Sequence, residues 1–205
     1  MKKIIYLIRH SLQYRNIEYQ NNNEDDQTKN EKIVLSIEGE KLAEELSENN
    51  ELEGIQELWS SNYCRAIATA KYISERNNII INIDERLNER KLGNLEKLKE
   101  LGENKTRSFV EEQLLNENFK NIDGESRKEV CERMTSCINS ILDSENEKIA
   151  IVSHGAAIKY YLLKVCELDE KCNLIYKGKI LNITSPCLLK ITFEDKKIIE
   201  INQII

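Results

Sequence analysis

The 205-residue chain has one proline and two histidines, and it lacks both a long apolar run and an excess of positive charge. No stretch approaches the roughly 20 apolar residues that a helix needs to cross a bilayer, so the sequence predicts no membrane span. Acidic residues outnumber basic residues by 36 to 30, which gives a formal net charge of −6. This balance argues against general nucleic-acid binding, because such binding depends on basic residues that neutralise phosphates.

The six cysteines form neither a metal-binding pattern nor a disulfide pattern. No two of them are spaced as a CxxC pair, and disulfide frameworks are typical of secreted chains much shorter than this one. The apolar run Ile4–Ile8 is too short for a secretory signal, since Arg9 interrupts it after five residues. We therefore expect a cytoplasmic protein with free thiols and no bound metal.

Short apolar runs alternate with amphipathic segments along most of the chain. The pattern predicts strands at 3–8, 55–60, 79–83 and 148–152, helices at 36–47 (with Ser36 as N-cap), 62–76, 126–142 and 156–166, and β-rich segments at 179–184, 187–193 and 198–203. This alternation predicts an α/β fold, a three-layer sandwich with a mostly parallel central sheet. Helices would cover both faces of the sheet, and an antiparallel strand would form its edge.

The chain contains no internal repeat and no linker rich in proline, glycine and serine, so we expect a single domain over residues 1–205. Two polar segments interrupt the alternating pattern. The first, at about 11–32, is predicted to be a long surface loop. The second, at about 95–123, is strongly charged without a clean apolar stripe, and we expect a helical lid or insertion there.

Both histidines directly follow apolar runs that are typical of buried strands. His10 follows the run that ends at Arg9, and His154 follows the strand predicted at 148–152 and precedes Gly155. Parallel strands deliver the residues at their carboxyl ends to one edge of the sheet, where α/β folds bind ligands. Histidine can act as a nucleophile or transfer protons near neutral pH, so these two residues are a candidate catalytic pair.

Two further charged residues lie just beyond predicted strands. Arg65 lies in the first turn of the helix that follows Ser61, and Glu89 follows the third predicted strand. Each alone has a plain structural interpretation as a solvated charge. Together with Arg9 and the two histidines, however, they are the groups that phosphoryl transfer through a phosphohistidine requires.

The same segments resemble the motifs of the histidine phosphatase superfamily, the phosphoglycerate-mutase-like enzymes. The family's Arg-His-Gly-x-Thr-x-x-Asn motif corresponds to Arg9-His10-Ser11-Leu12-Gln13-Tyr14-Arg15-Asn16. The later matches, in the family's order, are Ser61 through Ala70, Leu87 through Gly93, Gly124-Glu125-Ser126 and Ser153-His154-Gly155. The resemblance extends from residue 4 to about residue 160.

This resemblance implies a phosphohistidine mechanism. His10 Nε2 would attack the phosphorus atom, and the flanking arginines would keep the imidazole neutral. Arg9 and Arg65 would bind the phosphoryl oxygens, and His154 would donate a further hydrogen bond. Glu89, with a raised pKa, would protonate the leaving oxygen and then activate water.

The resemblance also implies a set of substrate-binding residues. The helix that begins near Gly155 would direct backbone N–H groups at the anion. Ser11, Gln13 and Asn16 of the first motif are further candidates for substrate binding. Arg15 and Arg90 could meet a second phosphate or a carboxylate of the substrate. Ser11 and Gln13 depart from the family's glycine and threonine, although a serine hydroxyl could still donate to a phosphate oxygen. Leu95-Glu96-Lys97 stands where many members have Trp-Glu-Gly, and it would affect substrate access more than chemistry.

The motifs are shared by phosphatases and phosphomutases. We favour a metal-independent phosphomonoesterase without a cofactor that acts on a small phosphorylated metabolite. A cofactor-dependent phosphoglycerate-type mutase is an alternative and would need a bisphosphorylated primer, but the chain is short for that class. A non-catalytic relative that binds phosphorylated ligands is a second alternative, and only the changes at Ser11 and Gln13 favour it. The β-rich C-terminal edge could pair in a homo-oligomer, although nothing in the sequence requires one.

Overall fold

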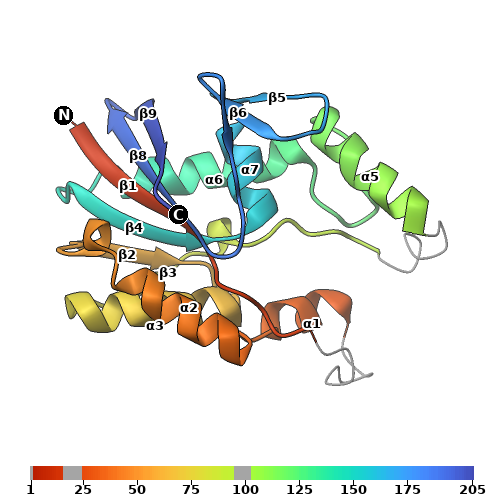
Figure 1. Cartoon of the computed structure of the whole chain (residues 1–205). Helices are drawn as coiled ribbons and strands as arrows, with labels where there is room; N and C mark the ends of the chain where they lie inside the picture. The colour runs from red at the N-terminus through yellow and green to blue at the C-terminus, as the bar shows by residue number, and fades with distance from the viewer. Residues whose placement is uncertain (1, 16–24, 95–102) are drawn as a thin grey trace.

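The structure, a computed structural model, describes residues 2–15, 25–94 and 103–205 (Figure 1). Its main element is a six-stranded sheet in the order β3-β2-β4-β1-β8-β9. The strands are β1 (Lys2–Arg9), β2 (Glu57–Ser60), β3 (Ile81–Ile83), β4 (Lys148–Ser153), β8 (Cys187–Glu194) and β9 (Lys197–Gln203). The helices are α1 (Asp26–Lys32), α2 (Ile37–Ser47), α3 (Cys64–Asn77), α5 (Glu103–Leu115), α6 (Arg127–Ile141) and α7 (Gly155–Leu162), with 3-10 turns η2 (Asn50–Leu52) and η3 (Glu85–Leu87).

The pairing of the strands confirms the predicted sheet. β4 pairs in parallel with both β1 and β2, and β2 pairs in parallel with β3. β8 runs antiparallel to β1, and β9 runs antiparallel to β8. The antiparallel edge therefore consists of two strands. Because β1, β2 and β4 are parallel, their carboxyl ends lie at the same edge of the sheet.

Hydrophobic cores lie on both faces of the sheet. Ile5 and Leu7 of β1 pack in the core that includes α6 and α7, whereas Tyr6 and Ile8 pack in the core that includes α2 and α3. Successive side chains of a strand point to opposite faces, so a strand covered on both sides is apolar throughout. Figure 1 shows α2 and α3 on one side of the sheet and α6 and α7 on the other, which confirms the three-layer arrangement.

Serine residues begin two of the helices. Ser36 caps α2 as predicted, and its Oγ accepts a hydrogen bond from the Gly39 N–H at 2.9 Å. Ser126 caps α6 in a capping box, in which Glu129 Oε2 accepts from the Ser126 N–H at 2.8 Å. These contacts satisfy N–H groups that the first helical turn leaves without intrahelical partners.

The polar segments contain more local structure than the sequence pattern indicated. The loop expected at about 11–32 ends in helix α1, which buries none of its side chains and therefore leaves no apolar stripe in the sequence. Before α1, Gln13 forms an isolated bridge with Leu35. Helix α5 covers only part of the insertion expected at about 95–123, and residues 95–102 lie outside the described residues.

A second, three-stranded sheet follows α7 and was not predicted. It consists of β5 (Glu167–Leu168), β6 (Leu174–Tyr176) and β7 (Lys179–Leu181), all antiparallel. Helix α7 ends earlier, and β7 is shorter, than the pattern indicated. Strands of two or three residues are too short to show an alternation of apolar and polar residues in the sequence. The pair Lys177-Gly178, whose φ angles are 48° and 78°, was the one sequence signal for the turn of this hairpin, because glycine favours positive φ.

Gly39 determines how closely α2 approaches the loop after β1. A Cβ atom on this residue would lie 2.0 Å from the Leu12 carbonyl oxygen. We expect Gly39→Ala to lower the free energy of unfolding by about 3 kcal/mol, because backbone atoms cannot move aside as a flexible side chain would. Urea denaturation measures the change. The exposed neighbour gives a matched control, since Glu38→Ala should cost less than about 0.5 kcal/mol. Equal stability of the two variants would contradict the close approach.

Candidate active site

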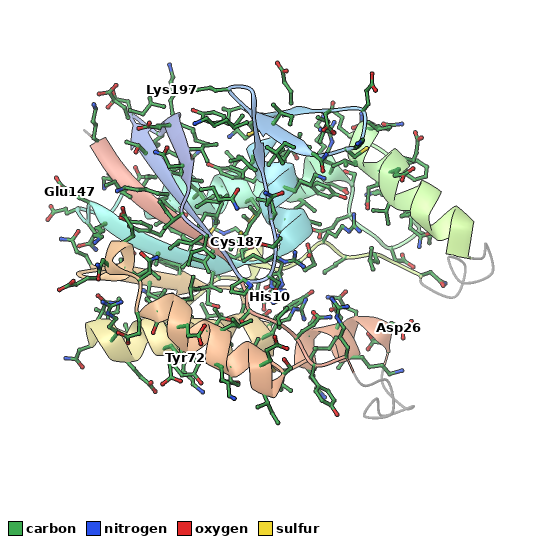
Figure 2. All side chains as sticks on the ribbon, in the orientation of Figure 1. His10, Asp26, Tyr72, Glu147, Cys187 and Lys197 are labelled. Atoms are coloured by element: carbon green, nitrogen blue, oxygen red, sulfur yellow. The ribbon has the colours of Figure 1, made fainter. Side chains whose placement is uncertain are left out.

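Three strand ends meet at one edge of the sheet and hold both histidines there. The His10 N–H donates to the Ser153 carbonyl at 3.0 Å, and the Ser61 N–H donates to the Val152 carbonyl at 3.1 Å. These bonds extend the inter-strand hydrogen bonding of the sheet by one residue past the ends of β1 and β2. The ring centroids of His10 and His154 are 5.0 Å apart, so the structure brings the predicted pair together. Figure 2 shows His10 where β1 leaves the sheet, on the side toward α1.

The hydrogen bonds of His10 define its tautomer. Its Nδ1 lies 2.7 Å from the Ser11 carbonyl oxygen, which can only accept, so Nδ1 carries the proton. Its Nε2 accepts a hydrogen bond from Arg65 Nε at 3.1 Å. Nε2 therefore holds the lone pair, and this is the nitrogen atom that a nucleophilic imidazole needs.

His10 is neutral over the whole physiological pH range. Burial is the main cause, and the positive charges of Arg65 and Arg9 act in the same direction, against the weaker effect of the Ser11 carbonyl. Together they lower the pKa of His10 from 6.5 to about 3. Only 3% of the residue is exposed, so no solvent stabilises an imidazolium there.

His154 is completely buried and is held by a serine. Ser61 Oγ lies 2.7 Å from His154 Nε2 and accepts from the Tyr63 N–H at 3.3 Å. Because Ser61 Oγ already accepts from Tyr63, we predict that its hydroxyl donates to His154 Nε2 and that the ring proton of His154 is on Nδ1. Burial, followed by the nearby His10 ring and Arg65, lowers the pKa of His154 well below 6.5. Its Nδ1 has no hydrogen-bond partner.

Arg9 lies against the first turn of α7. A Cβ atom on Gly155 would lie 3.0 Å from Arg9 Cζ, so the missing side chain of Gly155 makes room for the guanidinium group. Arg9 Nη1 donates to the Ile183 carbonyl at 2.5 Å, whereas the buried Nε has no partner. Two buried nitrogen atoms, Arg9 Nε and His154 Nδ1, thus lack hydrogen-bond partners at this edge of the sheet. Such groups are rare in folded proteins and indicate a site for a ligand with acceptor atoms.

Arg65 is held between His10 and helix α1. Besides its bond to His10, its Nη1 donates to the Asn30 carbonyl at 2.5 Å, and its guanidinium carbon lies 4.9 Å from the centre of the Tyr63 ring. Gln27 of the same helix donates to the Tyr63 hydroxyl at 2.6 Å. Part of the polar segment that we expected to be a surface loop therefore covers the site.

Glu89 lies at the N-terminus of α7. The N–H groups of Ala156 and Ala157 donate to its carboxylate at 3.2 and 3.1 Å, and the Arg90 N–H donates at 2.9 Å. We expected the first turn of α7 to direct its N–H groups at a bound anion. In the structure two of them donate to the side-chain oxygens of Glu89 instead.

The predicted substrate-binding residues that the structure describes, Gly155 apart, do not form one group around the histidines. The Ser11 hydroxyl donates to the Gly39 carbonyl at 2.7 Å, so it is directed away from a ligand and toward α2. Gln13 pairs through its backbone with Leu35, and Arg15 is exposed. Arg90 Nη1 donates to Gln113 Oε1 at 2.8 Å and to the Tyr160 hydroxyl. Asn16 lies outside the described residues.

A cavity of about 460 Å³ adjoins this group of residues. Arg9, Glu89, Arg90 and Gly155 line it together with residues of α5, α7 and the second sheet. Within the described ranges, no three His, Cys, Asp or Glu side chains are grouped so that they could hold a metal ion, and no helix is long and apolar enough to cross a membrane.

Several supporting residues were not singled out from the sequence. Ser61 belongs to a matched motif, but its bond to His154 links positions 93 residues apart and no local pattern shows it. Arg133 of α6 donates to the carbonyls of Arg86 and Glu89 and pairs with Glu125 at 2.8 Å, which holds the segment that carries Glu89. The Gly-Glu-Ser match includes Glu125 and was the one available signal for this support.

The model of the histidine phosphatase superfamily (branch 1) matches residues 5–202 of the chain. A sequence search among curated proteins finds no match. Among solved structures, a mycobacterial glucosyl-3-phosphoglycerate phosphatase superposes with a TM-score of 0.72 at 17% identity, over 100% of this chain and 98% of that one. YhfR of Bacillus stearothermophilus superposes with a TM-score of 0.70 at 20% identity, over 95% of this chain and 93% of that one. A phosphoglycerate mutase from Bacillus anthracis superposes with a TM-score of 0.70 at 19% identity, over 99% of this chain and 92% of that one. At these identities the likeness shows the shared fold.

The buried neutral state of His10 makes the stability of the protein depend on pH. The unfolded imidazole takes up a proton near pH 6.5, whereas the folded one does so only near pH 3, so stability falls as the pH falls through this window. At pH 5 the loss from His10 is about 2 kcal/mol relative to pH 7.5. Urea denaturation at both pH values should show that His10→Gln loses less stability on acidification than the wild type. An equal loss in the two proteins would mean that His10 is charged in the fold.

With two histidines in the chain, ¹⁵N NMR of the ring nitrogens can test the two tautomers directly. We expect both rings to carry the proton on Nδ1 at pH 7. Ser61→Ala should remove the fixed tautomer of His154 and leave that of His10 unchanged. Ser60 is a matched control, because it is equally buried but donates to the Ser61 carbonyl, so Ser60→Ala should change neither ring. A wild-type His154 protonated on Nε2 would show that Ser61 accepts rather than donates.

Proposed function

The chain belongs to the histidine phosphatase superfamily, and we propose that it is a metal-independent phosphomonoesterase that acts on a small phosphorylated metabolite. The observation that carries this proposal is the pair of buried nitrogen atoms without hydrogen-bond partners, Arg9 Nε and His154 Nδ1, beside a neutral imidazole. A phosphoryl group would supply acceptor oxygens to both. Guanidinium groups suit such oxygens well, because their planar forks can donate two parallel hydrogen bonds.

In the first step, His10 Nε2 forms a bond to phosphorus while the bond from phosphorus to the ester oxygen breaks. The electron pair of that bond stays on the leaving oxygen, which takes the proton of a protonated Glu89 carboxyl group and departs as an alcohol, leaving Glu89 as a carboxylate. Arg65 now donates to the lone pair of Nε2, so it would transfer this bond to a phosphoryl oxygen when the substrate enters. Arg9, Arg65 and His154 would then stabilise the charge on the transferring group.

In the second step, a water oxygen forms a bond to phosphorus while the bond from phosphorus to His10 breaks. The Glu89 carboxylate takes a proton from that water, and inorganic phosphate leaves. Glu89 thus returns to its initial state, and His10 recovers its lone pair. The backbone bonds that hold Glu89 on α7 keep one carboxyl group in position for both proton transfers.

We further propose that the enzyme uses no resident cofactor and works in the cytoplasm. All six cysteines are free thiols, in keeping with a reducing compartment. The proposed partner is a small phosphate ester rather than a nucleic acid or a membrane, because the site adjoins a cavity of about 460 Å³ in a chain of net charge −6.

The proposal is tested by phosphate release from 4-nitrophenyl phosphate at pH 6–8 in the presence of a chelator. We expect turnover that resists the chelator, is abolished in His10→Ala, and falls about 10²- to 10⁴-fold in Glu89→Gln. Glu75→Gln changes an exposed carboxylate on the far side of α3 and should retain full activity.

Three outcomes would contradict the proposal in different ways. Activity that survives in His10→Ala would exclude a phosphohistidine. Phosphoryl transfer between alcohols that requires a bisphosphorylated primer would identify a mutase. Binding of phosphate esters without turnover of any kind would identify a non-catalytic relative.

A further inference from the structure

The cavity beside Glu89 is larger than a phosphoryl group needs. Its volume of about 460 Å³ lies in the range of pockets that enclose whole metabolites. Val110 and Leu114 of α5 form one wall, and Leu174 and Leu181 of the second sheet form another. Figure 1 shows α5 and the second sheet side by side at the same end of the molecule. Arg9 and Glu89 also line the cavity, so it opens directly on the site where we place the reaction.

Two cations line this cavity without a carboxylate partner. Lys159 Nζ donates to the Cys172 carbonyl at 2.5 Å, and Arg90 bonds to the neutral side chains of Gln113 and Tyr160. In the part of the chain that the structure describes, no carboxylate lies within ion-pair distance of either one. Partial burial lowers the pKa of Lys159 below its ordinary value, although Cys172 and Asp169 act against this effect.

Two other partly buried cations have a carboxylate partner, whereas Lys3, Arg76 and Lys148 bond to backbone carbonyls as Lys159 does. Arg133 pairs with Glu125, and Lys190 pairs with Glu51 at 2.9 Å, although both side chains are only partly buried. In a chain with 36 acidic residues, partners for two more cations are readily available. The half-buried Lys159 ammonium group has lost part of its hydration, and Asp169 acts on it without an ion-pair contact, so a bound anion would stabilise its charge further.

Lys159 is placed to contact the far end of a substrate. Gly155 and Lys159 are four residues apart on α7, so they lie on the same face and about one helical turn (~5.4 Å) apart. Gly155 faces the Arg9 guanidinium, where the phosphoryl group would bind. A second anionic group that reaches Lys159 would therefore lie on the leaving-group side of the ester, beyond the apolar part of the cavity.

We propose that this cavity binds the leaving group and that Lys159 determines specificity for phosphate esters whose alcohol part carries a second negative charge and an apolar portion. The proposal rests on the proposed function, because it assigns the leaving-group side of that same site. It adds a residue that neither the motifs nor the catalytic steps use.

Two esters that differ only in charge can test the proposal. 4-(Carboxymethyl)phenyl phosphate and 4-(carbamoylmethyl)phenyl phosphate have nearly the same size and release phenols of similar basicity. We expect kcat/KM to be at least ~10-fold higher for the carboxylate ester, the size of effect that a charge-assisted hydrogen bond provides. In Lys159→Met this ratio should fall to about 1, because Met retains the length of the side chain without its charge.

Lys164 provides the matched control. It lies two residues past the C-terminal end of the same helix, and its Nζ donates to Thr135 Oγ1 and lies over the Tyr161 ring. Lys164 does not line the cavity. Lys164→Met should keep both the ratio and the individual rates of the wild type. A ratio that falls equally in the two lysine variants would show a general loss of positive charge and would overturn the assignment of Lys159.

Calorimetric binding of the two esters to His10→Ala separates this proposal from the proposed function. The inactive variant should bind the carboxylate ester ~10-fold more tightly than the amide ester, and His10→Ala combined with Lys159→Met should bind both equally. Equal affinities in His10→Ala would overturn the inference even if the native enzyme releases phosphate. Tighter binding of the carboxylate ester with no release of phosphate by the native protein would retain the inference about Lys159 and reject the phosphatase.

Discussion

The parallel pairing of β4 with β1 and β2 is the constraint on which the site depends. Arg9 is paired with Ser153 and Ser60 with Val152, so three strands end within one residue of one another. The next residues along the chain, His10 and His154 among them, must then lie together. A slip of one residue in either pairing would turn the buried faces of the strand over, so the two cores hold the register of the site as well as the fold.

Burial and charge cooperate at this edge of the sheet. Both imidazoles are kept neutral, first by their loss of solvent and then by the guanidinium groups around them. The same guanidinium groups have carbonyl oxygens, not carboxylates, as their protein partners. Among the described residues, no carboxylate neutralises these two guanidinium groups, so their positive charge can bind an external anion, although the chain as a whole is acidic. The carboxylate of Glu89 is the exception, and the backbone of α7 holds it.

Much of this arrangement was predictable because it depends on strand ends and short motifs. The positions of His10 and His154 follow from apolar runs that stop at a polar residue, and Ser36 was recognisable as a helix cap. The rest depends on contacts that leave no local pattern. Helix α1 has no buried side chain, and the second sheet has strands too short to alternate. The position of Glu89 on α7 joins segments 67 residues apart, so its hydrogen bonds could not be read from spacing.

The bond from Arg65 to the Asn30 carbonyl has a consequence for which ligands can enter. A peptide oxygen of α1 accepts the hydrogen bond of this arginine. A ligand that took over this donor would have to be a better acceptor than an amide oxygen, as an anionic phosphate is and an uncharged sugar or alcohol is not. Such competition would favour anionic ligands over neutral ones without any clash of shape.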